Sequence, residues 1–154
     1  MEKITPFLWF DKEAGEAARF YTSVFKNSKI KDTTTLHKTP SGTVEIITIE
    51  ILGQDFQLVS AGPYFKFSEA ISFVVNCDTQ DEIDYYWEKL SADPKAEQCG
   101  WLKDKFGVSW QIVPTIMHKM QSDKDEKKLA RVTEAILRMK KFDIEELKRA
   151  YNGR

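Results

Sequence analysis

Short blocks of apolar and polar residues alternate along the chain, and the spacing within each block predicts its secondary structure. The run Ile4–Phe10 is almost wholly apolar and too short for a typical helix, so it predicts a buried strand. Residues 12–25 carry apolar side chains at helical spacing with charged side chains between them, which predicts an amphipathic helix. Asp11 stands just before this segment, where a residue that caps the helix is expected.

The remainder of the first half predicts three strands. Residues 29–37 are rich in threonine and predict a strand toward a sheet edge, and residues 43–52 alternate with β-branched side chains. A turn at Gly53 leads into a third strand at residues 56–60. The first half is therefore β-α-β-β-β.

The second half begins again with a short apolar strand at residues 70–76. Asp78 or Thr79 can cap the helix that follows, and a polar crossover then leads into residues 98–113. This last segment predicts a hairpin, because two apolar arms flank a charged turn that closes on Gly107.

The two halves share a sequence pattern. Residues 53–59 and 107–113 both read G-x-x-aromatic-Q-aliphatic-V, and the apolar strand 7–10 aligns with 73–76. Two matching elements in the same order indicate a duplicated module, with about a dozen residues missing from the middle of the second copy. Generic β-α-β-β repetition without common descent is the alternative explanation.

These patterns divide the chain into four segments that we expect to form one globular unit. They are a first module at 1–60, a linker at 61–69, a second module at 70–114 and a helical extension at 115–154. The aromatic residues of the linker either cover a cavity or pack over the sheet edge.

The extension lies outside the repeat. Ser122-Asp123 is an N-cap signal before a charged amphipathic helix at about 125–141, and Asp143-x-x-Glu146 is a capping box that opens a last short helix. An amphipathic helix must bury its apolar face, so these helices pack either on their own sheet or on a second copy of the chain.

Composition narrows the possible functions. The chain has 154 residues, 42% of them hydrophobic, a net charge of −1 and two cysteines. The absence of a basic excess argues against nucleic acid, and two thiols favour a cytoplasmic protein over a disulfide framework. The first residues enter a strand at once and no apolar run has membrane length, so we expect neither a signal peptide nor a membrane partner.

Three segments carry a resemblance to a known family. They are LWFD…EAARFYTSVF, AISFVVNCDTQDEIDYYWEKLS and QCGWLKDKFGVSWQIVP. Together they resemble the PhnB-like branch of the vicinal-oxygen-chelate superfamily, which includes glyoxalases, bleomycin-resistance proteins and extradiol dioxygenases. Members of this branch are often called demethylubiquinone methyltransferases. The resemblance spans roughly residues 3–150, terminal helices included, and implies an α+β fold in which two β-α-β-β-β modules form a curved, mixed sheet around a cavity. It also implies a homodimer.

Superfamily members that use a metal take four ligands from symmetric strand positions. That pattern places Gln57 and Gln111 at the last-strand positions, and Thr5-Pro6 and Ile71-Ser72 at the first-strand positions. Nitrogen and oxygen sites for nickel, zinc or iron require imidazole or carboxylate ligands, which these positions lack. We therefore expect neither a metal nor another cofactor. The two glutamines either hydrogen-bond within the core or hold a polar ligand, and the residues leave both alternatives open.

Other residues are candidates for contact with a ligand. Strand alternation puts Ser109 on the same face as Gln111, and Trp101 and Asn76 are further candidates for lining the cavity. Trp9 falls on either side of its strand. Lys103-Asp104-Lys105 is expected to be a solvated turn, with steering of a substrate as the alternative. Cys99 is a candidate nucleophile. Because no histidine lies near it in sequence to activate the thiol, a buried small residue is the favoured alternative.

Three functions fit these residues. The first is a metal-free domain that binds a small organic molecule through Gln57, Gln111, Ser109, Trp101, Cys99, Asn76 and Trp9. The second is a metal-dependent enzyme of the glyoxalase or dioxygenase type, with ligands supplied in part by a partner subunit. The third is an interaction module whose cavity is filled by its own side chains. All seven glycines are isolated, so the chain has no glycine-rich loop that could bind a nucleotide-like cofactor. The residues therefore do not support methyl transfer.

Overall fold

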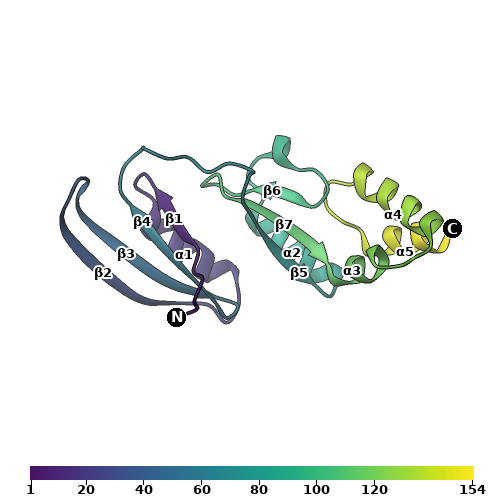
Figure 1. Cartoon of the computed structure of the whole chain (residues 1–154), viewed down its shortest axis with the longest axis horizontal. Coiled ribbons are helices and arrows are strands. Elements are labelled where there is room, and N and C mark those ends of the chain that lie inside the picture. The colour runs from purple at the N-terminus through teal and green to yellow at the C-terminus, as the bar shows by residue number, and fades with distance from the viewer. The chain divides into compact units, whose positions relative to one another are not determined.

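Two separate sheets run through the computed structural model, which describes all residues from 1 to 154 (Figure 1). The chain divides into two units, residues 1–66 and 67–154, and the division falls inside the segment predicted to be a linker. No helix combines the length and the apolar character needed to cross a membrane.

The first unit is a four-stranded mixed sheet with one helix. In the sheet order β1-β4-β3-β2, β1 is parallel to β4 and the other neighbours are antiparallel. The sheet therefore confirms the predicted β-α-β-β-β order and the edge position of the threonine-rich strand. Its elements are β1 (Phe7–Phe10), α1 (Ala14–Val24), β2 (Lys29–Thr39), β3 (Gly42–Ile51) and β4 (Gln54–Ser60).

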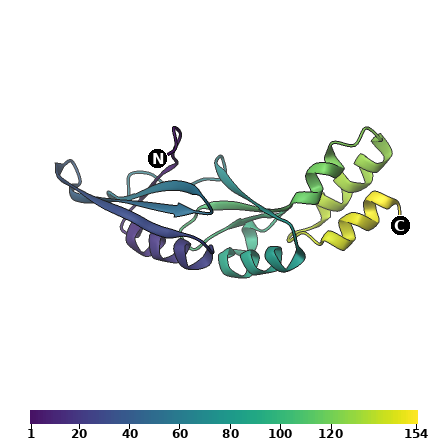
Figure 2. The ribbon, with the colours of Figure 1, turned by 90° about the horizontal axis from the view of Figure 1, so that it is seen from below.

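Helix α1 covers one face of this sheet, and the other face carries no helix (Figure 2). The period of two along each strand decides which side chains enter the core. Phe56 and Leu58 of β4 lie under α1 and are buried, whereas Gln57 between them points to the opposite face and is half-buried.

Two local predictions in the first unit are wrong. Ile4 is 86% exposed, and β1 begins only at Phe7, where pairing with β4 starts. Asp11 does not cap α1, because the amide of Ala14 donates instead to Ser60 Oγ at 2.9 Å. A hydroxyl from the neighbouring strand thus satisfies a backbone donor that a local side chain was expected to satisfy.

The second unit contains a three-stranded mixed sheet in the order β5-β7-β6, with α2 on one face. Thr79 caps α2 by accepting from the amide of Glu82, as predicted. The second unit thus has the order β-α-β-β, one strand fewer than the expected β-α-β-β-β module. The dozen residues missing from the middle of the second repeat account for the difference. The elements are β5 (Ser72–Cys77), α2 (Gln80–Leu90), a short 3₁₀ turn (Pro94–Ala96), β6 (Trp101–Lys103) and β7 (Ser109–Pro114).

The charged turn between β6 and β7 is not simply solvated, because Asp104 is only 3% exposed. Asp104 Oδ1 accepts from the amides of Phe106 and Val108 at 2.9 and 3.0 Å, and Oδ2 accepts from Trp110 Nε1 at 2.9 Å. These bonds satisfy a buried carboxylate and tie the turn to the first residues of β7.

The extension folds against its own unit, which settles where the predicted helices bury their apolar faces. Its helices are α3 (Thr115–Gln121), α4 (Glu126–Arg138) and α5 (Ile144–Asn152). Their buried residues form one cluster with Val113 of β7. Asp125, not Ser122-Asp123, caps α4, while Asp143 caps α5 by accepting from the amide of Glu146 as predicted. Helix α3 was not predicted.

The segment between α4 and α5 is bonded to the start of the hairpin. The amides of Cys99 and Gly100 donate to the carbonyls of Met139 and Lys140 at 2.9 and 2.8 Å. Gly100 has a φ of +81°, and an added Cβ would lie 2.3 Å from Cε2 of the buried Phe142 ring. Gly100 is therefore required both for its backbone conformation and for close packing.

Replacement of Gly100 by alanine should test this contact. The left-handed backbone costs about 1–2 kcal/mol for a residue with a Cβ, and overpacking against Phe142 adds about 1–3 kcal/mol. Gly107→Ala is the matched control, because its φ is +86° and no atom lies within 4 Å of its added Cβ. Urea unfolding should show a larger loss of stability for Gly100→Ala than for Gly107→Ala. Equal losses would contradict the packing role of Phe142.

Candidate functional site

In the second unit, the sheet face opposite α2 presents two rows of paired side chains. Ser109 of β7 pairs with Ser72 of β5 on one side and with Lys103 of β6 on the other. Two residues along, Gln111 pairs in the same way with Val74 and Trp101. Directly paired residues share a face, so the first row carries two hydroxyls and an ammonium group, and the second carries an amide between apolar side chains.

Gln111 forms a hydrogen bond within this face. Its Nε2 donates to Ser72 Oγ at 2.9 Å, which leaves its carbonyl oxygen on the half-buried surface between Val74 and Trp101. Gln57 takes the corresponding place in the first unit, where Nε2 lies 3.5 Å from Oγ1 of Thr48. Both glutamines therefore reach a hydroxyl of a neighbouring strand on the helix-free face.

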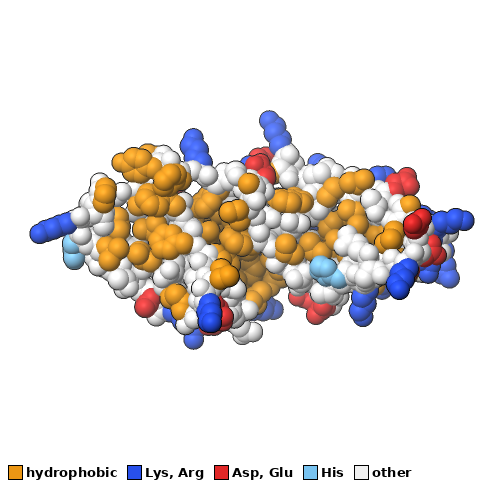
Figure 3. Space-filling model, viewed as in Figure 1, with side chains coloured by type: hydrophobic (Ala, Val, Ile, Leu, Met, Phe, Trp, Pro, Cys, Tyr) orange, Lys and Arg blue, Asp and Glu red, His pale blue; other side chains and the backbone are white.

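The helix-free face of the first unit is largely apolar (Figure 3). Trp9 belongs to this face, because it pairs with Val59, and its Nε1 donates to the carbonyl of Gly62 at 2.9 Å. Phe65 of the linker packs edge-on against Trp9, with ring centroids 5.1 Å apart. Phe65 thus packs on the sheet, although Tyr64 and Phe65 stay 69% and 65% exposed.

The positions at which the resemblance implies metal ligands carry no charged side chain. In the second unit, the first-strand residue Ser72 and the last-strand residue Gln111 are neutral and bonded to each other. In the first unit the carboxylate nearest to Gln57 along β4 is Asp55, and both its oxygens accept from Lys31 Nζ at 3.0 and 3.1 Å. No three His, Cys, Asp or Glu side chains of the chain form a group that could hold a metal ion. The donors present do not fit a divalent transition metal.

The exposed Asn76 lies further along the same face of β5 as Ser72 and Val74. Its Oδ1 is 3.0 Å from Nε2 of His118 on α3. This contact joins the end of β5 to α3 at the surface.

Cys99 lies outside the two rows. It is half-buried against the segment between α4 and α5, and its nearest polar partner is Nε2 of Gln98, 3.5 Å from Sγ. The hydrogen bonds of the two histidines, His37 and His118, go to Thr43 and Asn76 instead. Cys99 is therefore not the fully buried small residue that was favoured, and no histidine is bonded to its thiol. Cys77, on the core side of β5, is fully buried, and burial raises the pKa of its thiol to about 12.

The predicted site residues therefore fall into two groups, one on each unit. Ser109, Gln111 and Trp101 lie in adjacent positions on one face, with Asn76 on the same face, while Gln57 and Trp9 share the corresponding face of the first unit. Sequence reasoning missed Ser72 and Lys103 as neighbours of Ser109. The register of the hairpin could have identified Lys103, because a turn from Asp104 to Val108 sets Lys103 opposite Ser109.

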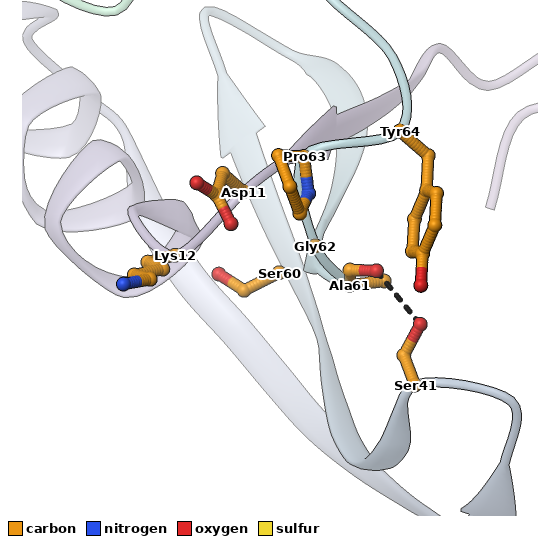
Figure 4. A pocket seen from close by; sticks show the side chains of 8 residues that line it. All are labelled: Asp11, Lys12, Ser41, Ser60, Ala61, Gly62, Pro63 and Tyr64. Carbon is orange, nitrogen blue, oxygen red and sulfur yellow. Dashed lines mark hydrogen bonds between the residues drawn. The ribbon is translucent and has the colours of Figure 1, made fainter.

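A depression of about 390 Å³ in the first unit is a separate candidate (Figure 4). It lies between Asp11 and Lys12, the end of β4 and the linker, with Tyr64 across from Ser60. Its two hydroxyls already have partners, since Ser60 Oγ accepts from Ala14 and Ser41 Oγ donates to the carbonyl of Ala61 at 2.7 Å. We therefore assign it no ligand.

Comparison with known proteins identifies the relatives of the chain. A family model described as 3-demethylubiquinone-9 3-methyltransferase matches residues 2–113. A PhnB protein from Bacillus cereus is 33% identical, with a TM-score of 0.61, over 74% of this chain and 100% of that one. The resemblance was expected to extend to about residue 150. The match to the family model ends at residue 113, before α3, so it does not include the terminal helices. No curated protein matches the chain.

Two more distant structures share the fold alone. Protein PA1353 from Pseudomonas aeruginosa is 16% identical, with a TM-score of 0.58, over 74% of this chain and 98% of that one. The fosfomycin resistance protein FosX from Listeria monocytogenes is 14% identical, with a TM-score of 0.55, over 77% of this chain and 98% of that one. The FosX structure holds Mn(II) and 1S,2S-dihydroxypropylphosphonic acid. These neighbours confirm the glyoxalase-like α+β fold.

The two thiols should differ in reactivity. At neutral pH we expect DTNB to modify Cys99 in the native protein and Cys77 only after denaturation, because a buried thiol with a raised pKa forms little thiolate. Cys99→Ser should remove the native reaction. The pKa of the Cys77 thiol is about 9 in the unfolded chain and about 12 in the folded protein. Its contribution to stability is therefore present below pH 9 and is lost as the pH rises toward 12. Rapid native modification of both thiols would contradict this assignment.

Proposed function

The chain belongs to the PhnB-like branch of the vicinal-oxygen-chelate superfamily, and on that premise we propose that it binds a small organic molecule without a metal. The binding surface is the helix-free face of the second unit, around Gln111 and Trp101, with Ser109 buried beside them. Asn76 borders this surface, and Gln57 and Trp9 offer similar groups on the first unit.

One observation carries this proposal, namely the row Val74, Gln111 and Trp101. Val74 is 48% exposed, Trp101 and Gln111 are half-buried, and Gln111 keeps a carbonyl oxygen that no side chain of the face occupies. Ligand sites typically combine apolar and aromatic walls with a few fixed polar groups. The bond from Gln111 to Ser72 fixes the amide in advance, so little side-chain entropy is lost when a ligand binds.

Metal-dependent chemistry of the glyoxalase or dioxygenase type is less well supported. The first- and last-strand positions of the second unit hold a hydroxyl and an amide that satisfy each other. A divalent transition metal would bring two charges to donors that carry none, and water competes well against such ligands. The Mn(II) of FosX therefore gives no guide to this chain, with which it shares only the fold.

The activity in the family's description also lacks support in the residues. The turns from β1 to α1 and from β5 to α2 contain no glycine. A nucleotide-like cofactor is usually held where a glycine-rich turn lets backbone amides approach its anionic or ribose groups. We therefore do not extend methyl transfer to this chain.

We further propose that the chain forms a homodimer. Large apolar side chains are exposed on or beside the strands, and such side chains favour association when they are contiguous. On the first unit they include Phe7 at 49% and Leu36 at 41% exposure.

Binding can be tested with benzamide, a neutral aromatic amide, followed by ¹H–¹⁵N NMR of the labelled full chain. We expect shifts at the Trp101 indole and the Gln111 side-chain amide. Gln111→Ala should weaken binding about fivefold, as loss of one hydrogen bond does, without reducing stability by more than about 1 kcal/mol. Gln98→Ala is the matched control, because that exposed amide bonds the Leu137 carbonyl outside the two rows. Loss of stability in Gln111→Ala with no benzamide binding to the wild type would indicate a packing role instead.

Native mass spectrometry of freshly purified protein should show a dimer without a stoichiometric divalent metal. An added organic mass would indicate the class of the natural ligand. A metal near one per chain would overturn the metal-free assignment, and a monomer at micromolar concentration would overturn the dimer.

A further inference from the structure

The row formed by Ser72, Ser109 and Lys103 carries hydroxyls and a positive charge, which the adjacent row of Val74, Gln111 and Trp101 lacks. All three side chains belong to one face and to neighbouring strands, because Ser109 is the register partner of both others. Two hydroxyls and one ammonium group in a line are donors for an anion.

Ser109 is the most informative member of this row. It is 1% exposed, and its Oγ is buried without a hydrogen-bond partner. A buried hydroxyl without a partner costs about 1–3 kcal/mol of stability, and native proteins rarely keep one without a reason. The Ser109 hydroxyl is therefore a buried donor without an acceptor in the folded chain.

Ser72 can donate to the same place. Its Oγ already accepts from Gln111 Nε2 at 2.9 Å, which occupies one acceptor site of the oxygen and leaves its hydrogen for an acceptor. The glutamine thus orients Ser72 as a donor beside Ser109.

Lys103 supplies the charge, and it already holds a carboxylate. Its Nζ lies 2.6 Å from Oε1 of Glu69, which precedes β5 and whose side chain is 65% exposed. The bond from Lys103 keeps the pKa of the Glu69 carboxyl below its usual value, so this group is an anion at neutral pH. Glu69 contacts only the ammonium group of the row and leaves Ser109 without a partner.

We propose that Ser72, Ser109 and Lys103 form a subsite for the carboxylate of the ligand, and that Glu69 is an internal competitor for it. One ligand oxygen binds Lys103 in place of Glu69, and the other accepts from Ser109 and Ser72. The adjacent row of Val74 and Trp101 then contacts the apolar part, which makes the ligand a small aromatic or unsaturated monocarboxylate. This subsite rests on the proposed function.

Benzoate and benzamide form a matched pair of probes, because they share a ring and differ mainly in charge. Titrated into the labelled full chain, benzoate should bind the wild type more tightly, and Lys103→Met should weaken benzoate about tenfold and benzamide less than about twofold. Ser109→Ala should weaken benzoate about fivefold. Glu69→Gln should strengthen benzoate about two- to fivefold, since an exposed ion pair competes only weakly.

Lys105→Met is the matched control, because Lys105 lies in the same hairpin turn and its Nζ is 5.2 Å from the centroid of the Phe106 ring. It should leave both affinities unchanged, and an effect equal to that of Lys103→Met would overturn the subsite in favour of diffuse charge attraction. Equal binding of both probes, insensitive to Lys103→Met and Glu69→Gln, would overturn the carboxylate subsite while the proposed function stands. Failure of both probes to shift Trp101 and Gln111 would overturn the two proposals together.

Discussion

The alternation of side chains along one central strand is the constraint on which each unit depends. β4 and β7 are each flanked by strands on both sides, so their register is fixed twice. Trp110 and Ile112 enter the core under α2, and Ser109 and Gln111 necessarily face the other way. A shift of one residue would bury an amide and expose a tryptophan, which makes the arrangement of the candidate site inseparable from the packing of the core.

The register of β7 is held at both ends by contacts that lie outside the sheet. Just before β7, the Asp104 carboxylate accepts hydrogen bonds from two backbone amides and from the indole of Trp110. A buried carboxylate is stable only when donors of this kind reach it. At the other end, Val113 joins the core of the helical extension, and Phe142 fills the space beside Gly100. The extension lies beyond the matched family segment, yet it stabilises the hairpin that carries Trp101 and Gln111.

Much of the fold could be predicted from the sequence because it depends on local periodicity. The alternation in β7 placed Ser109 with Gln111, and the aligned glutamines indicated equivalent strands in the two units. Contacts between distant residues could not be predicted in this way. Three consecutive charged residues suggested a solvated turn, and only the fold brings the Trp110 indole to Asp104; likewise Ser60 replaces Asp11 at the start of α1. Helix α3 was missed because its short apolar pattern, around Met117 and Met120, has no capping signal before it.

The replacement of charged ligand positions by an amide and a hydroxyl changes what the helix-free face can recognise. A metal ion in such a place attracts anionic substrates through its own charge, so protein cations nearby are less needed. With Ser72 and Gln111 bonded to each other, any selectivity for an anion must come from the chain itself. Lys103 is the cation that the strand register brings to this face, beside the unpaired hydroxyl of Ser109. The register that buries Trp110 in the core therefore also positions the groups that would recognise an anion.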